Sequence, residues 1–381
     1  MTVDPVELTA ALVRCPSVTP DAGDALALLD DVLSAGGFRT TRVDRGGVPN
    51  LFAIAGEGPA FGFNGHVDVV PTGDPALWSA PPFGAEIRGD RMIGRGTVDM
   101  KSGVAAFVAA AVAHVALSGT QHAIALAITG DEEGSARDGT QALLDWMRDT
   151  GHSMRTCIVG EPTGRSRVGD TIKIGRRGSI SARIRAEGTQ GHVAYPTEAL
   201  NPLTGLVRFL DRVASAELDQ GTADFDPSTL AITTVDTGNT AGNVIPAAAT
   251  AALNIRFNDA QTGDGLAAWL QATAARVSEE TGVTLDLETT QSADSFVTAP
   301  GPFPTFVAET VEEMTGVRPD RSTSGGTSDA RFVTHHCAVV ELGLVGQGMH
   351  AVDESVDVRD IRTLTNVYAR LLQRSAGMPL T

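Results

Sequence analysis

The stretch AFGFNGHVDVV, residues 60–70, reads as a buried strand that carries a histidine and an aspartate near its end. Successive side chains of an extended strand point to opposite faces. His66 and Asp68 therefore share one face, while Val67 and Val69 share the other. Two polar side chains thus lie next to each other where an apolar strand ends, and this predicts both a strand of a sheet and a candidate site.

The first 175 residues alternate strand and helix patterns around this stretch. NLFAIAG, residues 50–56, and HAIALAIT, residues 122–129, read as further strands, and the second is apolar on both faces. SGVAAFVAAAVAHVALS, residues 102–118, reads as a helix that is apolar nearly all round. This order predicts the α/β class, with a mixed sheet sandwiched by helices.

The pattern changes near residue 179. SISARIRAE, residues 179–187, alternates polar and apolar residues, and the following segment has the strand and helix content of a compact α+β unit. After about residue 292 the chain returns to the earlier pattern. We therefore predict a discontinuous main domain of residues 1–177 and 292–381, and an inserted domain of residues 178–291.

Composition and charge limit the classes of function. With 381 residues, 42% of them hydrophobic and 20% charged, the chain is typical of a soluble globular protein with more than one core. Its net charge of −17 argues against nucleic acid as a partner. The N-terminal residues lack a signal-peptide pattern, and the longest apolar run is shorter than the roughly 20 residues that span a bilayer. We expect a cytoplasmic protein with no membrane partner.

Acidic and imidazole side chains recur at places where predicted strands end. Glu132 and Glu133 follow the strand over residues 123–129, Glu161 follows another strand, and His350 follows a strand that ends near residue 343. Asp99 lies in a glycine-rich loop before the apolar helix. Because ligand sites of open α/β sheets gather beyond the carboxyl ends of strands, we expect these side chains to converge.

Clustered carboxylates repel one another and raise one another's pKa, and a divalent cation removes that cost. Imidazole nitrogens and carboxylate oxygens suit zinc, cobalt or manganese. The three cysteines, isolated in the sequence, indicate neither a disulfide framework nor a thiolate zinc site. The alternative for each acidic residue alone is a solvated loop charge or a helix cap. Taken together, their placement favours a metal site.

Nine motifs give the chain a resemblance that extends over nearly its whole length: GHVDVVP, GRGTVDMKSG, TGDEEG, VGEPT, GRRGSI, QGHVAYP, GNVIPA, GGTSDARF and MHAVDE. In this order they resemble the dinuclear zinc aminoacylase and carboxypeptidase family. Within that family they are most similar to members that remove a succinyl group from an amino acid. The resemblance implies a zinc-exopeptidase-like catalytic domain, an inserted dimerisation domain that closes over the site, and a homodimer.

The resemblance also implies a ligand set for two zinc ions per subunit, with cobalt as a possible substitute. His66 and Glu161 would hold one ion, Glu133 and His350 would hold the other, and Asp99 would bridge both. A bridging carboxylate keeps two ions close enough to polarise one reacting group. In the family, the peptide bond that follows the bridging aspartate is cis.

Three further residues acquire roles from the same resemblance. Asp68 would orient the imidazole of His66 and raise its basicity. Glu132 would not bind metal but would take a proton during attack on the amide and deliver it to the departing amine. His192, in the inserted domain, would reach the active site of the partner subunit and donate a hydrogen bond to the carbonyl oxygen.

The implied substrate is a small N-acyl amino acid whose carboxylates need cations. Arginine suits carboxylates because its planar guanidinium can bind both oxygens. Matching family positions that contact substrate are Arg176 and Arg256, with Ser179, Tyr195, Asn243, Gly326 and Thr327 as polar neighbours.

Two departures from the family pattern leave the substrate open. Gly242 stands where succinyl-removing members usually carry asparagine, and Gly346 stands at another usual asparagine position, four residues before His350. Both changes remove polar contacts and leave the metal ligands untouched. A deacylase that acts on N-acetylornithine or another N-acyl amino acid is therefore the alternative. A serine hydrolase is not indicated, because the chain has no G-x-S-x-G motif.

Overall fold

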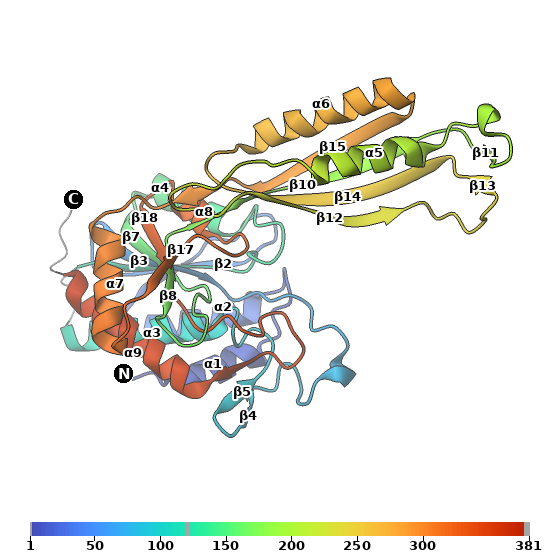
Figure 1. Ribbon diagram of the computed structural model, residues 1–381. Helices are drawn as coiled ribbons and strands as arrows, with labels where there is room; N and C mark the ends of the chain where they lie inside the picture. The colour runs from blue at the N-terminus through green and yellow to red at the C-terminus, as the bar shows by residue number, and fades with distance from the viewer. Residues whose placement is uncertain (1, 119–121, 377–381) are drawn as a thin grey trace. The chain divides into compact units, whose positions relative to one another are not determined.

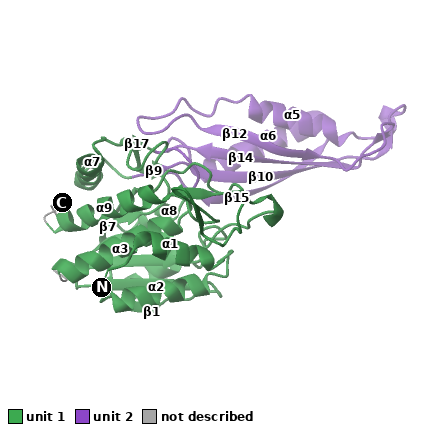
Figure 2. Cartoon of the chain, turned by 90° about the horizontal axis from the view of Figure 1, so that it is seen from below, with its two compact units in different colours: residues 1–175, 298–322, 328–381 green, residues 176–297, 323–327 purple. Residues whose placement is uncertain are grey.

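The computed structural model describes residues 2–118 and 122–376 (Figure 1). The chain divides into two compact units, shown in different colours in Figure 2. Unit 1 consists of residues 1–175, 298–322 and 328–381, and unit 2 consists of residues 176–297 and 323–327. The inserted domain predicted from the sequence, residues 178–291, lies within unit 2.

An eight-stranded mixed sheet forms the centre of unit 1, in the order β1-β2-β6-β3-β7-β18-β8-β17. Its strands β2, β3 and β6 are buried along their whole length, which explains their continuous apolar sequences. Strands β3, β6 and β7 run parallel, so the loops that follow them leave the sheet at the same edge. The strand bounds are β1 Arg39–Arg42, β2 Asn50–Ala55, β3 Ala60–His66, β6 Ile124–Thr129, β7 Met154–Val159, β8 Thr171–Lys173, β17 Asp320–Ser322 and β18 Ala338–Glu341.

Helices cover this sheet, and α3 (Lys101–Ser118) is the most deeply buried of them. It packs against strand β3 and between α1 (Pro5–Arg14) and α9 (Val358–Ser375). Among the described residues, α3 alone is long and apolar enough to cross a membrane, and 72% of it is buried inside the protein, as in a core helix. The other helices of unit 1 are α2 Gly23–Ala35, α4 Thr140–Asp149, α7 Pro302–Thr315 and α8 Ala330–Val333.

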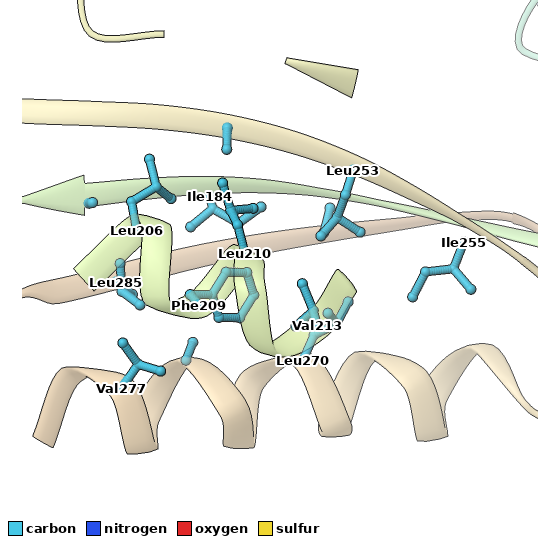
Figure 3. Packing of buried hydrophobic residues seen from close by; sticks show 14 of the residues in the cluster. Ile184, Leu206, Phe209, Leu210, Val213, Leu253, Ile255, Leu270, Val277 and Leu285 are labelled. Carbon is cyan, nitrogen blue, oxygen red and sulfur yellow. The ribbon is translucent and has the colours of Figure 1, made fainter. Parts of the chain in front are cut away.

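Unit 2 is an antiparallel sheet, in the order β12-β14-β10-β15, with two helices packed on one face. Strand β10 alternates buried and exposed residues, and its buried residues, such as Ile184, meet Leu206, Phe209 and Leu270 from the helices (Figure 3). This two-residue period is that of a sheet with one covered face. The bounds are β10 Gly178–Glu187, β12 Thr229–Asp236, β14 Ala248–Phe257, β15 Thr284–Ala293, α5 Pro202–Ala214 and α6 Gly263–Thr281.

Short elements complete the chain. In unit 1, β19 pairs with β5, and β5 pairs with β4. In unit 2, β11 pairs with β13 in a two-stranded ribbon. The bounds are β4 Glu86–Arg88, β5 Arg91–Ile93, β9 Gly175–Arg176, β11 Gly191–His192, β13 Val244–Ile245, β16 Phe296–Val297, β19 Ser355–Asp357, and the 3-10 helices Pro75–Leu77 and Pro196–Glu198.

Two histidines near the end of α3 give stability a pH dependence that is separate from the candidate site. The rings of His114 and His122 lie 5.5 Å apart, and Ser375 Oγ lies 2.8 Å from His122 Nε2. Burial lowers the pKa of His114, and burial together with His114 and Arg155 lowers the pKa of His122. Both groups therefore bind fewer protons in the folded state than in the unfolded state. Their contribution to stability is complete above about pH 6.5 and is lost as the pH falls below that value.

We expect His114 and His122 to lower the free energy of unfolding as the pH falls from about 8 to 5.5, so the wild type should lose more stability over this range than a protein that carries His114→Gln and His122→Gln. Denaturant unfolding at both pH values measures the difference. His335→Gln, at an exposed histidine, serves as the control and should leave the pH dependence of the wild type. An equal loss in the double variant and the wild type would contradict the assignment.

Candidate metal centre

The ends of three parallel strands bring the predicted metal ligands of unit 1 together. His66 is the last residue of β3 and pairs in register with Thr129, the last residue of β6. The loop after β6 carries Glu132 and Glu133, and the loop after β7 carries Glu161. Parallel neighbours that end at one level place their following loops side by side, as the sequence led us to expect.

Two further loops complete the cluster. Asp99 lies two residues before the start of α3, and the peptide bond between Asp99 and Met100 is cis, as the resemblance implied. His350 lies between β18 and β19, with a backbone φ of +62° in the left-handed region. This conformation is uncommon for residues other than glycine, so the surrounding structure must hold it.

The carboxylate of Asp99 lies between two imidazoles and faces each with a different oxygen. Its Oδ1 is 3.2 Å from His66 Nε2, and its Oδ2 is 3.2 Å from His350 Nε2. His350 Nε2 is also 2.9 Å from Glu133 Oε1, and His66 Nε2 is 3.7 Å from Glu161 Oε1. This is the arrangement that a bridging carboxylate with two ligands on either side requires.

The charges of the cluster fit divalent cations. Potential ligand atoms of His66, Asp99 and Glu133 lie within 4.8 Å of one another, as do those of His66, Glu132 and Glu161. Hydrogen bonds to Asp99 and Glu133 raise the pKa of His350 to about 10. The carboxylates thus create a strongly negative potential, and a donor set of imidazole nitrogens and carboxylate oxygens matches zinc or a similar cation.

Glu132 differs from its neighbour. Its Oε2 is 4.0 Å from His66 Nε2, and its side chain is 12% exposed. Burial and the nearby charge of Glu161 raise the pKa of Glu132 well above its usual value. A carboxyl group whose proton affinity is raised in this way is suited to receive and release a proton.

Asp68 does more than the sequence suggested, because it holds the backbone of the glutamate loop as well as facing the imidazole. Its Oδ1 accepts a hydrogen bond from Glu132 N at 3.2 Å, and its Oδ2 accepts from Glu133 N at 3.1 Å and from Thr19 Oγ1 at 2.7 Å. His66 Nδ1 lies 2.9 Å from the backbone oxygen of Asp68 and 3.5 Å from its Oδ1. One buried residue therefore positions three members of the cluster.

The predicted substrate-contacting residues all lie in unit 2, in two groups. In the first group, Ser179 is paired in register with Arg256, and Arg176 Nη1 donates to Gly326 O at 3.0 Å, next to Thr327. Ser179 and Arg176 are buried.

The second group lies on the ribbon of β11 and β13. His192 is exposed, and its ring lies 5.7 Å from that of Tyr195. Asn243 accepts a backbone hydrogen bond from Val193. Strand β10 separates the two groups, since the eight steps from Ser179 to Glu187 along an extended strand span about 27 Å. Unit 2 therefore brings the members of each group together but does not bring the two groups to one place.

Comparison with known proteins identifies the class to which this fold and cluster belong. The profile of the peptidase family M20/M25/M40 matches residues 62–374, and the chain belongs to this family. A tripeptidase from Staphylococcus aureus has a TM-score of 0.80 at 16% identity, covering 98% of each chain. A protein from Bacillus subtilis described as a dinuclear metal-binding peptidase of the M20 family has a TM-score of 0.75 at 14% identity, covering 98% of each chain. These likenesses confirm the predicted α/β fold with its mixed sheet.

Relatives in sequence narrow the class further. A succinyl-diaminopimelate desuccinylase of Cereibacter sphaeroides is 58% identical over 98% of this chain and 99% of its own length. A protein of the same name from Dinoroseobacter shibae is 57% identical over 97% of this chain and 98% of its own length. The resemblance to succinyl-removing members of the family, predicted from nine motifs, is confirmed.

Proposed function

We propose that this chain is a metal-dependent amidohydrolase that cleaves N-succinyl-LL-2,6-diaminopimelate to succinate and LL-2,6-diaminopimelate, a cytoplasmic step of diaminopimelate and lysine biosynthesis. The observation that carries the hydrolytic chemistry is the Asp99 carboxylate between the imidazoles of His66 and His350. The 58% identity to a named desuccinylase over nearly the whole chain supports the substrate.

The cluster has the ligands for two zinc ions, with cobalt as a substitute. His66 and Glu161 would hold one ion, Glu133 and His350 the other, and Asp99 both. When bound, two such ions polarise the amide carbonyl and supply a nucleophile near neutral pH. Asp68 keeps the imidazole of His66 oriented toward the cluster.

Glu132 carries out the proton transfer. Its carboxylate takes the proton of the attacking water, and the resulting carboxyl group gives that proton to the amine as the carbon–nitrogen bond breaks. The bonds from Asp68 to the backbone of Glu132 and Glu133 fix the loop that presents both side chains. The two adjacent glutamates thus have different roles: Glu132 transfers protons, and Glu133 would bind a cation.

Residues of unit 2 would bind the substrate. Arg176 and Arg256 would bind its carboxylates, with polar contacts from Ser179, Tyr195, Asn243, Gly326 and Thr327. The two groups lie farther apart than the roughly 15 Å length of an extended acylated diaminopimelate. A homodimer resolves this separation, because one subunit can supply the first group and its partner the second, which includes His192.

The substrate is tested by the ratio of kcat/KM for N-succinyl-LL-diaminopimelate to that for N-acetylornithine in zinc-loaded protein. We expect a ratio of at least about 100, since a site built for a carboxylate is left with unpaired polar groups by an acetyl substrate. Gly242 favours the alternative deacylase, because it lacks the asparagine side chain that succinyl-removing members usually carry at this position. A ratio below one would overturn the substrate and leave the hydrolytic chemistry standing.

A further inference from the structure

Two charged side chains behind the metal centre, Arg95 and Glu354, form a buried ion pair. Arg95 Nη1 donates to Glu354 Oε2 at 2.6 Å, and the two side chains are 3% and 0% exposed. Placing two charges in the interior is costly unless further hydrogen bonds satisfy them. The further hydrogen bonds of this pair are made to the two loops that carry Asp99 and His350.

Glu354 holds the loop that carries Asp99. Its second carboxylate oxygen, Oε1, accepts hydrogen bonds from Val98 N at 2.8 Å and from Asp99 N at 3.2 Å. The backbone of the proposed bridging residue is therefore fixed by a carboxylate 255 residues away in the sequence. Because charge-assisted bonds to backbone N–H groups are strong, they limit where the Asp99 carboxylate can lie.

Arg95 holds the loop that carries His350. Its Nη2 donates to His350 O at 3.2 Å, and its Nη1 also donates to Ala351 O at 3.1 Å. Arg95 Nη2 donates to Pro71 O at 3.3 Å, and its guanidinium lies 5.3 Å from the ring centre of Trp78. These contacts fix the plane of the guanidinium. They stabilise the left-handed backbone of His350, which a histidine does not adopt readily.

We propose that Arg95 and Glu354 are a positioning pair that sets the distance between the Asp99 carboxylate and the His350 imidazole. The pair thereby sets the affinity of the cation position formed by His350 and Glu133. The inference rests on the proposed metal centre and adds to it two residues that contact neither cation nor substrate. Both cation positions share Asp99, but no hydrogen bond of the pair described above reaches His66 or Glu161, whereas Arg95 also holds the loop of His350. The other cation position should therefore depend less on the pair.

Glu354→Gln tests the pair, because glutamine keeps the length of the side chain and one oxygen for the N–H groups but loses the charge that faces Arg95. Zinc titration against a competing chelator measures each bound equivalent, and the visible spectrum of the cobalt-loaded protein reports ligand geometry. We expect the second equivalent to bind about 10–100-fold more weakly, with a changed cobalt spectrum. The first equivalent should lose less affinity than the second, and excess zinc should restore turnover.

Glu313→Gln is the control, since it removes a carboxylate from an exposed pair with Arg370 and should leave both equivalents unchanged. A purely structural role would lower thermal stability without a selective loss of one equivalent. If Glu354→Gln does not fold, as judged by circular dichroism, Arg95→Lys carries the test, because lysine keeps a cation opposite Glu354 but lacks the fork that reaches His350 O.

Wild-type protein is titrated first, so that two failures can be told apart. Fewer than two equivalents in the wild type would refute the proposed metal centre. Two equivalents in the wild type, with both affinities and the cobalt spectrum retained in a folded variant of the pair, would overturn the positioning role alone.

Discussion

Glu132→Gln is expected to lower kcat by about 10²–10⁴ while the protein keeps both zinc ions. Glutamine matches the shape of glutamate but cannot accept the proton of the attacking water. The backbone of Glu132 is held by Asp68, so the substitution leaves the loop in place. Steady-state kinetics with N-succinyl-LL-diaminopimelate, together with elemental analysis of the same sample, measure the two expectations.

The neighbouring residue supplies a matched control. Glu133 Oε1 is 2.9 Å from His350 Nε2, and both residues are proposed ligands of the same zinc ion. Glu133→Gln should therefore lose one zinc equivalent as well as activity, whereas Glu132→Gln should lose activity alone. Near-normal turnover in Glu132→Gln, or a loss of zinc equal to that in Glu133→Gln, would remove Glu132 from the proton-transfer role.

The convergence of the candidate ligands could be predicted because local patterns determine it. The sequence shows one apolar strand that ends at His66 and two others that are followed by the Glu132–Glu133 pair and by Glu161. Parallel pairing then carries these ends to one edge of the sheet, and the register of His66 with Thr129 aligns two of them. The alternation in β10 likewise predicted a sheet with one covered face.

The arrangement behind the cluster could not be predicted, because it depends on contacts between distant segments. The bond between Thr19 and Asp68 and the pair of Arg95 with Glu354 join residues that share no local pattern. Arg95 and Glu354 are single charged residues in loops, and the sequence around each does not indicate that its side chain is buried. The position of Arg256 beside Ser179 could not be predicted either, since it follows from the register of β10 with β14.

His192 is the residue whose proposed role depends most on the proposed homodimer. It lies on the exposed ribbon of β11 and β13, about the length of β10 away from Ser179 and Arg256. No contact among the described residues of unit 2 places it beside them, and in the proposed homodimer it acts on the site of the partner. His192→Ala should then lower kcat by about 10²–10³, the usual cost of removing one hydrogen-bond donor to the developing oxyanion.

Mixing two inactive variants distinguishes action across subunits from action within one chain. In a mixed dimer of His192→Ala and Glu132→Gln, one site combines an intact Glu132 with the His192 of its partner. Random exchange of subunits between equal amounts of the two variants makes half of the dimers mixed. Each mixed dimer has one complete site out of two, so about a quarter of wild-type activity should be restored. Light scattering must show a dimer, and mass spectrometry of differently tagged subunits must show exchange. Exchanged dimers without restored activity, or a fully active monomer, would contradict a catalytic contribution of His192 across the interface.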